Sequence, residues 1–158
     1  MPAKAEAEWK GDLPSGSGTF KAGDTISGGY TFKSRFEDGP GSNPEQLIAA
    51  AHAACFSMAF SNNLAKAGFT PESVHTDASV QLRNIDGKPT IAKIDLVTVG
   101  RVPGIDEAAF LEQAEAAKAG CPATWKKSVA SPCCSRRKST CSPSGSWSIR
   151  TPVPPTGS

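Results

Sequence analysis

The sequence predicts an α+β domain in which an antiparallel sheet packs on one long central helix. The first observation is an unbroken, mostly apolar helical pattern over residues 43–67. The second is the alternation of apolar and polar residues over 74–83, followed by a partner strand over 91–101. A shorter helical pattern over 106–120 is the third. With 158 residues the chain has the length of one domain and can bury a substantial core.

Short strands are expected on both sides of the long helix. Before it, turns containing Gly, Ser and Asp separate three of them, at residues 5–10, 18–21 and 29–34. After it, the segment 84–88 joins the two longer strands, and its Asp-Gly pair favours a tight hairpin turn. The second helix is expected to begin after Asp106 as its N-cap and to stop at Gly120.

The long helix has clear start and stop signals. Asn43 is a good N-cap, Pro44 suits the first helical position, and Gln46 completes a box-like arrangement with the cap. Gly68 is a natural residue to end it. The helix is apolar on most faces, which predicts a central position in the core. Polar residues interrupt it and Lys66 closes it, so a membrane span is not expected.

Cys55 lies deep inside this helix. By position alone it is more often a small buried hydrophobe than a reactive group. Reactivity requires the thiolate, and no Lys or Arg lies near Cys55 within the helix, so Arg35 is the candidate cation. Cys121, just after the second helix, is a candidate second thiol. His52 shares a helix face with Cys55, but a lone histidine is more often a core or interface residue.

Helix geometry adds a prediction about assembly. Glu45 and Cys55 are ten positions apart, which is about 15 Å along a straight helix. One copy of the helix therefore does not bring both side chains to one substrate. An antiparallel second copy, related by a two-fold axis, would do so and would create two equivalent sites. A catalytic role for both residues thus predicts a homodimer.

Six segments stand out along the chain: WKGDL (9–13), RFE (35–37), NPEQLIAAAHAACFSM (43–58), AGFTP (67–71), VPGID (102–106) and AKAGCP (117–122). Their order and spacing resemble the OsmC/Ohr family of thiol-dependent hydroperoxide reductases, and its OsmC branch in particular. The resemblance covers residues 29–121 and, with the first segment, roughly the first three quarters of the chain. The resemblance implies an OsmC-like fold, an intertwined homodimer, and no metal or other cofactor.

The resemblance also implies roles for four residues. Cys55 matches the peroxidatic cysteine of the family and Cys121 its resolving cysteine. Arg35 matches the arginine that holds the thiolate, and Glu45 the glutamate that orients this arginine. The implied reaction reduces organic hydroperoxides, and less specifically hydrogen peroxide, in oxidative and osmotic stress defence. It proceeds through a sulfenic acid and a disulfide, which a small or lipoyl-type dithiol reduces.

Composition narrows the partners and the location. The net charge is only +2, and the first 120 residues contain no basic stripe with interleaved aromatic residues, so a nucleic-acid partner is not expected. Residues 1–10 alternate small and charged residues and lack the apolar run of a signal peptide. We therefore expect a reducing, cytoplasmic location, where cysteines are more often catalytic than structural.

The chain changes character after the second helix. Residues 124–158 are rich in Ser, Pro, Arg, Lys, Thr and Cys, whereas the family continues with a short helix and a final strand. We expect a peroxidase domain over 1–123 and an atypical tail over 124–158 that is disordered or results from a shifted reading frame. The final strand would then be lost and a sheet edge exposed. A zinc site is not expected in the tail, because its cysteines lack the paired spacing of zinc ligands: Cys133, Cys134 and Cys141.

Three classes of function remain open from the residues themselves. The first is a peroxidase with Cys55 as nucleophile. The second is another cysteine enzyme, such as a thiol–disulfide oxidoreductase or a cysteine hydrolase. The oxidoreductase usually has a Cys-x-x-Cys motif, and residues 1–123 contain none. The hydrolase needs a base oriented by a third group, and His52 has no evident partner of this kind. The third is a non-catalytic dimeric binding protein that keeps the fold and an inert buried thiol.

Overall fold

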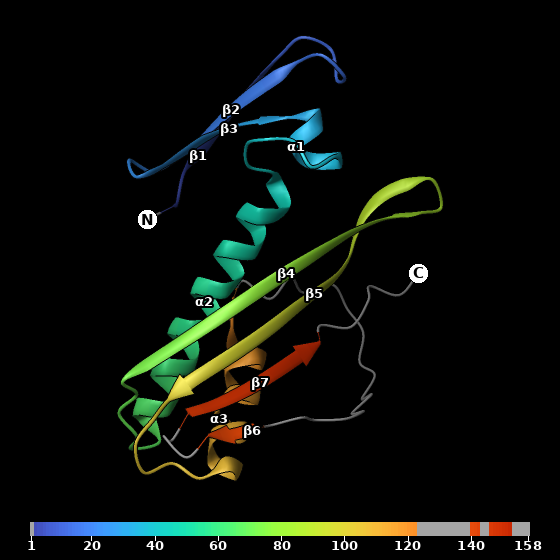
Figure 1. Cartoon of the computed structure of the whole chain (residues 1–158). Coiled ribbons are helices and arrows are strands. Elements are labelled where there is room, and N and C mark those ends of the chain that lie inside the picture. Colours follow the sequence, from blue (N-terminus) through green and yellow to red (C-terminus); the bar gives the residue numbers. More distant parts are fainter. Residues whose placement is uncertain (1, 123–139, 143–145, 153–158) are drawn as a thin grey trace. The chain divides into compact units, whose positions relative to one another are not determined.

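The computed structural model describes residues 2–122, 140–142 and 146–152 (Figure 1). The chain divides into two compact units, Met1–Leu47 and Ile48–Ser158, which are described in turn. Both contain helices and antiparallel strands, which confirms the predicted α+β class.

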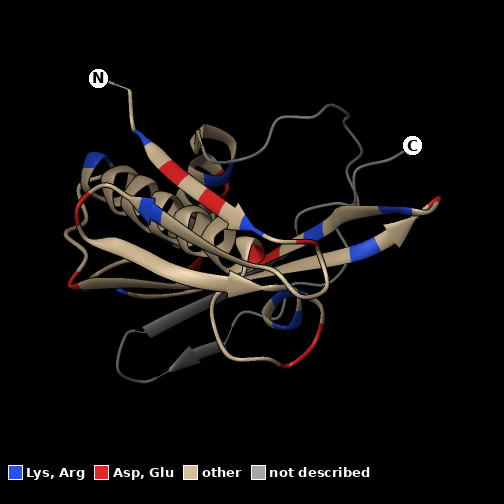
Figure 2. Ribbon diagram, turned by 90° about the horizontal axis from the view of Figure 1, so that it is seen from above, with Lys and Arg blue, Asp and Glu red and all other residues tan. Residues whose placement is uncertain are grey.

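The first unit is built on a three-stranded antiparallel sheet. Its strands are β1 (Ala5–Lys10), β2 (Ser17–Ala22) and β3 (Ile26–Thr31), in this order. The rings of Trp9 and Tyr30 meet with centroids 5.3 Å apart. Gly18 pairs with both residues, and a Cβ there would lie 2.5 Å from the Tyr30 ring, so only glycine fits between them. Acidic and basic residues alternate with others along β1 (Figure 2), where Lys10 pairs with Glu8 at 3.2 Å.

The strand predicted over 29–34 was wrong for its last three residues. They belong to a short helix, α1 (Phe32–Phe36), which follows β3 directly. Thr31 caps this helix, because its hydroxyl oxygen accepts a hydrogen bond from the Ser34 backbone N–H at 3.1 Å. The Ser34 hydroxyl oxygen accepts from the Thr31 N–H in return at 2.9 Å. This reciprocal capping favours a helical turn over continued strand.

The long helix, α2 (Pro44–Lys66), has the predicted ends. The Gln46 N–H donates to the Asn43 side chain at 2.8 Å, and the Asn43 N–H donates to the Gln46 side chain at 3.1 Å. These two bonds form a capping box. At the other end Gly68 has a φ of +89°, while the N–H groups of Gly68 and Phe69 bond to the carbonyls of Ala65 and Leu64. This is the Schellman arrangement, which glycine favours.

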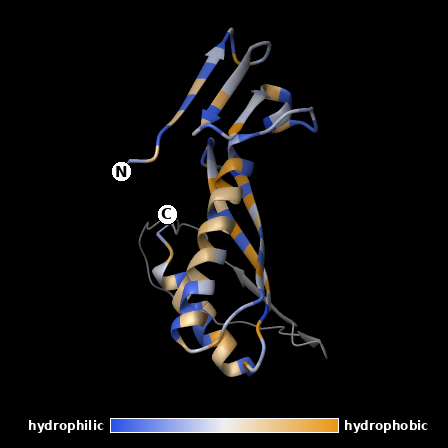
Figure 3. Cartoon of the chain, turned by 90° about the vertical axis from the view of Figure 1, so that its left-hand side faces the viewer, coloured by the Kyte–Doolittle hydropathy of each residue, from blue (hydrophilic) through white to orange (hydrophobic). Residues whose placement is uncertain are grey.

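A four-stranded antiparallel sheet forms the second unit together with the helices. Its strands are β4 (Ser73–Ile85), β5 (Lys88–Arg101), β6 (Thr140–Ser142) and β7 (Ser146–Pro152), in the order β4-β5-β7-β6. The helix α3 (Glu107–Gly120) follows β5, and the Asp106 side chain caps it by accepting from the Ala109 N–H at 2.8 Å. Both α2 and α3 cover the same face of the sheet (Figures 1 and 3).

The predicted hairpin between β4 and β5 is confirmed. Asp86 and Gly87 both have positive φ angles, 51° and 78°, and Ile85 pairs with Lys88 across the turn. Two central residues with positive φ match the right-handed twist of the flanking strands, which is why Asp-Gly is favoured here. His75 is exposed and lies 3.4 Å from Asp77.

The core of the second unit lies between the two helices and the sheet. Its buried members come from α2, β5, α3 and the β5–α3 connection: Phe56, Phe60, Leu64, Leu96, Val102, Ile105, Phe110, Ala114 and Ala117. The rings of Phe60 and Phe110 meet edge to face with centroids 5.0 Å apart. This geometry suits the charge distribution of aromatic rings and fixes α3 against α2.

The prediction that the tail contributes no strand was wrong for residues 140–142 and 146–152. The strand β7 pairs with β5 from Asp95 to Arg101, so the sheet edge expected to be exposed is occupied. The sequence of β7 alternates Trp147, Ile149 and Thr151 with Ser148 and Arg150, a period of two that suits a strand. The division at residue 123, the frame-shift hypothesis and the expected disorder stay predictions, and Cys133 and Cys134 lie outside the described residues.

None of the helices in the described part of the chain is both long and apolar enough to cross a membrane.

Candidate active site

Two of the predicted site residues meet in the second unit. Cys55 lies in the middle of α2 and is half-buried, whereas Cys121 is the C-cap of α3 and is only 3% exposed. Neither is in a disulfide, and the Cys121 thiol donates to the Cys55 sulfur with 2.9 Å between the two Sγ atoms. The two sulfurs are therefore close enough to form a disulfide with only a small local movement.

The end of α3 holds Cys121 in this place. Its backbone N–H donates to the Ala117 carbonyl at 2.9 Å, which closes the last turn of the helix. Ala114 and Ala117 are buried on the same helix, and Phe110 anchors it to Phe60 of α2. The packing of α3 against α2 thus brings together two cysteines that are 66 residues apart in the sequence.

A chain of hydroxyl groups connects α2 to the sheet two residues beyond Cys55. The Ser57 hydroxyl donates to Thr76 of β4 at 2.8 Å, and the hydroxyls of Thr76 and Thr98 of β5 lie 3.0 Å apart. Thr98 is 2% exposed, so its polar group depends on this bonding. These side chains fix the position of α2 along the strands, and the sequence analysis missed them. The alternating pattern that puts Thr76 on the inner face of β4 was their only signal.

His52 is buried one helical turn before Cys55. It is 4% exposed, and its Nδ1 atom is buried without a hydrogen-bond partner among the described residues. Burial lowers the pKa of its imidazole below the ordinary value of about 6.5, because a low-dielectric environment disfavours the charged form. The imidazole is therefore neutral at pH 7 and retains one nitrogen lone pair.

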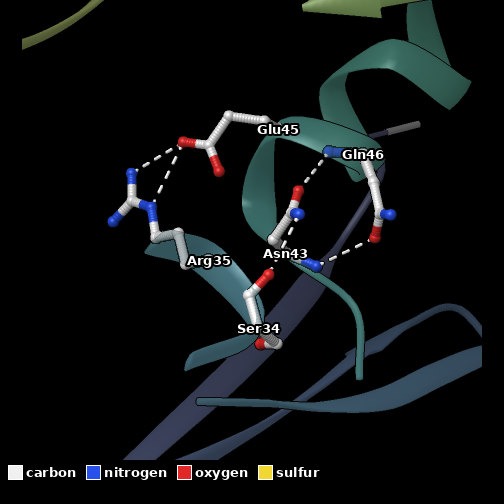
Figure 4. A network of polar contacts seen from close by, with 5 residues as sticks. All are labelled: Ser34, Arg35, Asn43, Glu45 and Gln46. Atoms are coloured by element: carbon white, nitrogen blue, oxygen red, sulfur yellow. Dashed lines mark hydrogen bonds and ion pairs between the residues drawn. The ribbon is translucent and has the colours of Figure 1, made fainter. Parts of the chain in front are cut away.

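The other two predicted site residues meet in the first unit. Arg35, in the last turn of α1, donates from Nε and Nη2 to a single oxygen, Oε1, of Glu45 at 3.2 and 2.8 Å (Figure 4). Glu45 lies in the first turn of α2, where the helix dipole favours an acidic side chain. The Arg35 guanidinium also lies 5.2 Å from the ring centroid of Phe36. Carboxylate and ring together restrict the directions that the guanidinium can take.

Two hydrogen bonds of Ser34, the residue before Arg35, hold the short helix in place. The Ser34 hydroxyl donates to the Ser42 carbonyl at 2.8 Å. The Asn43 side-chain amide donates to the Ser34 carbonyl at 3.3 Å (Figure 4). Ser34 is buried and also completes the cap of α1. The sequence analysis did not identify Ser34 or Phe36, although the spacing Thr31-x-x-Ser34 resembles a capping box.

Known proteins resemble this chain over most of its length. The model of the family described as "OsmC-like protein" matches residues 37–132. "Peroxiredoxin OsmC" of Escherichia coli (strain K12) is 49% identical over 121 residues, which cover 75% of this chain and 85% of that protein. The same figures hold for "Peroxiredoxin OsmC" of Shigella flexneri.

Solved structures share the fold at lower identity. The organic hydroperoxide resistance protein OhrB of Bacillus subtilis aligns with a TM-score of 0.56 and 24% identity, covering 75% of this chain and 86% of that one. An OsmC-like protein of unknown function from Vibrio cholerae aligns with a TM-score of 0.62 and 18% identity, covering 78% and 91%. The family match, the curated relatives and the fold agree, and the chain belongs to the OsmC family, as an oxidoreductase of the thiol-dependent peroxidase class.

Proposed function

We propose that the chain reduces organic hydroperoxides, and less specifically hydrogen peroxide, by a cycle in which Cys55 is oxidised and Cys121 resolves it. One observation carries the proposal: the Sγ atoms of these two thiols lie 2.9 Å apart. The similar protein of Bacillus subtilis is an organic hydroperoxide resistance protein, which supports an organic substrate. The reaction would serve oxidative stress defence, and the family resemblance extends the proposal to osmotic stress.

The first step oxidises Cys55. Its thiolate sulfur attacks the distal oxygen of the hydroperoxide, the O–O bond breaks, and the alkoxide leaves as an alcohol after taking up a proton. Cys55 is then a sulfenic acid. In the second step the Cys121 sulfur attacks Cys55 Sγ, the S–O bond breaks, and water leaves. A small or lipoyl-type dithiol reduces the resulting disulfide by thiol–disulfide exchange, which suits a reducing cytoplasmic location.

Arg35 and Glu45 serve the first step in this proposal. A guanidinium stabilises a thiolate and the negative charge that develops on the leaving oxygen. Glu45 holds two nitrogens of that guanidinium and so orients it, without contact to the sulfur. Glu45 and Cys55 are ten positions apart in α2, about 15 Å along the helix. The economical arrangement is a homodimer in which one subunit supplies the ion pair and the other supplies the thiols.

An exposed apolar stripe on α2 supports the homodimer. Ala51, Ala54 and Met58 are exposed in the single chain, at spacings of three and four that put them on one helix face. Met58 is 73% exposed, although it is apolar. Figure 3 shows apolar colour along most of the helix. A two-fold contact between two such stripes would bury them.

The experiment that tests the function follows hydroperoxide consumption by the purified protein with a dithiol reductant. We expect multiple turnovers of an organic hydroperoxide by the wild type and none by Cys55→Ser. The matched variant, Cys121→Ser, is expected to consume about one equivalent and then to stop as a sulfenic acid that dimedone traps. Wild-type protein that leaves the hydroperoxide unchanged would exclude the peroxidase cycle and favour a binding protein with an inert thiol.

A further inference from the structure

His52 is a buried polar group that the cycle described so far does not use. Its side chain is 4% exposed, and Nδ1 has no hydrogen-bond partner among the described residues. A buried polar atom without a partner is rare and destabilises the fold, so it calls for an explanation. The only other histidine of the chain, His75, is exposed and pairs with Asp77.

The position of His52 relates it to the thiols. Residues three apart on a helix are neighbours with Cβ atoms about 5–6 Å apart, so His52 and Cys55 share a face of α2. Cys121 adjoins Cys55 from α3, with its Sγ 2.9 Å away. All three residues belong to the second compact unit. Oxidation would add a hydroxyl group to Cys55, on the helix face that it shares with His52, whose Nδ1 has no partner among the described residues.

The resolving step requires a proton to move in this buried place. As Cys121 Sγ attacks Cys55 Sγ, the Cys121 thiol must lose its proton. At the same time the oxygen leaving Cys55 must gain one to depart as water. Cys121 is 3% exposed, so bulk water has little access to the proton of its thiol.

We propose, resting on the function proposed above, that His52 carries this proton. Its neutral imidazole accepts the proton of Cys121 as the S–S bond forms, and donates the same proton to the hydroxide released as the S–O bond breaks. The products are the Cys55–Cys121 disulfide, water and neutral His52, so atoms and electrons balance without another reactant. The lowered pKa that burial gives the imidazole keeps it neutral and ready to accept a proton at pH 7.

The test separates the two chemical steps by rapid quenching and mass spectrometry after one equivalent of cumene hydroperoxide. Dimedone traps the sulfenic acid, and an alkylating reagent stops disulfide closure. The informative variant is His52→Asn, because its amide puts a polar atom near the position of Nδ1 but does not accept a proton at neutral pH. His52→Gln is the second variant, and His75→Asn is the matched control at the exposed histidine.

We expect His52→Asn to form the sulfenic acid within about twofold of the wild-type rate. Disulfide closure should slow about 100-fold, within the range typical of a lost acid–base group, and sulfinic acid should accumulate. His75→Asn should match the wild type in both steps. Disulfide closure at the wild-type rate in His52→Asn or His52→Gln would overturn the proposed role of His52 and leave the proposed peroxidase function standing. Wild-type protein that forms no sulfenic acid would overturn the proposed function and this inference with it.

The pH dependence of closure in the wild type gives an independent test, which applies even if neither variant folds. A neutral imidazole as acceptor predicts a closure rate that is level above about pH 7 and falls about tenfold per pH unit below the pKa of the imidazole, which lies under 6.5. Uncatalysed attack would instead rise about tenfold per unit up to the ordinary thiol pKa of about 8.5. That rising profile in the wild type would exclude His52 as the proton carrier.

Discussion

At the scale of single residues, helix ends place three of the proposed site residues. Cys121 is the C-cap of α3, Glu45 lies in the first turn of α2, and Arg35 lies in the last turn of α1. Residues at helix ends have fewer backbone hydrogen bonds than residues inside a helix. Such residues can therefore hold a defined position and still move during a reaction. Cys55 differs, because it lies in the middle of a helix.

The first prediction concerns the ion pair of Arg35 and Glu45. We expect Arg35→Ala to lower the second-order rate of Cys55 oxidation by about 100-fold, since a group that stabilises developing charge is lost. Glu45→Gln should lower it less, about tenfold, because the guanidinium is then only less well oriented. Stopped-flow measurement of sulfenic acid formation gives both rates. Lys33→Ala, on the same short helix and exposed, is the control and should match the wild type.

The second prediction concerns the contribution of His52 to the pH dependence of the free energy of unfolding. Burial lowers its pKa in the folded protein, so between that pKa and about 6.5 the unfolded chain binds more protons than the folded one. The free energy of unfolding should therefore fall as pH drops below about 6.5, by at most about 1.4 kcal/mol per pH unit from this group. Urea unfolding at several pH values measures it. His52→Asn should lose this part of the slope and His75→Asn should keep it.

At the scale of elements, α2 is attached to its neighbours in two different ways. Apolar side chains, above all Phe56 and Phe60, pack into the core, and the hydroxyl chain from Ser57 runs to β4 and β5. The apolar contacts contribute most of the stability but allow small sliding movements. The hydroxyl bonds are directional and hold the helix in one register, which keeps Cys55 opposite Cys121.

The third prediction tests this hydroxyl chain. We expect Thr98→Val to lower the free energy of unfolding by about 1–3 kcal/mol, because the partly buried Thr76 hydroxyl loses a partner. The volume of the side chain hardly changes, so no cavity contributes. Urea unfolding measures the effect, and Thr70→Val at an exposed position is the control. A change below about 0.5 kcal/mol in Thr98→Val would show that the chain contributes little to stability.

At the scale of the whole molecule, the exposed apolar stripe of α2 is the feature that a single chain leaves unexplained. Met58 alone is 73% exposed in the middle of the longest helix. Scattered exposed apolar residues are ordinary, but a stripe on one helix face marks an interaction surface more often. The proposed homodimer would cover this stripe.

The fourth prediction follows from that stripe. We expect sedimentation equilibrium at micromolar concentration to give a dimer for the wild type. Met58→Lys should shift the equilibrium towards monomer, because the two-fold axis would bring two lysine charges into an apolar contact. Activity should fall in parallel, since each proposed site needs both subunits. Ala116→Lys, at an exposed alanine of α3, is the matched control and should stay dimeric. A wild type that sediments as a folded, active monomer would contradict the prediction.

The sequence by itself determined the features that depend on neighbours in the chain. The Asn43–Gln46 capping box, the glycine end of α2, the Asp106 cap and the Asp86-Gly87 turn all rest on bonds or dihedral angles within a few residues. Such local geometry is the same in any fold that contains it. The cap of α1 also rests on bonds within a few residues. Its Ser34 stands where a typical capping box has Glu or Gln, so the sequence indicated the start of this helix only weakly.

Only the tertiary structure decided the features that join distant segments. The sequence suggested Cys121 as a second thiol, but the 2.9 Å contact with Cys55 exists because α3 packs on α2. The strand β7 pairs with β5 from Asp95 to Arg101, and the alternation within the tail does not by itself reveal this long-range partner. The burial of His52 likewise depends on what packs against its face of α2. Local sequence specifies which groups are available, and long-range packing determines which of them meet.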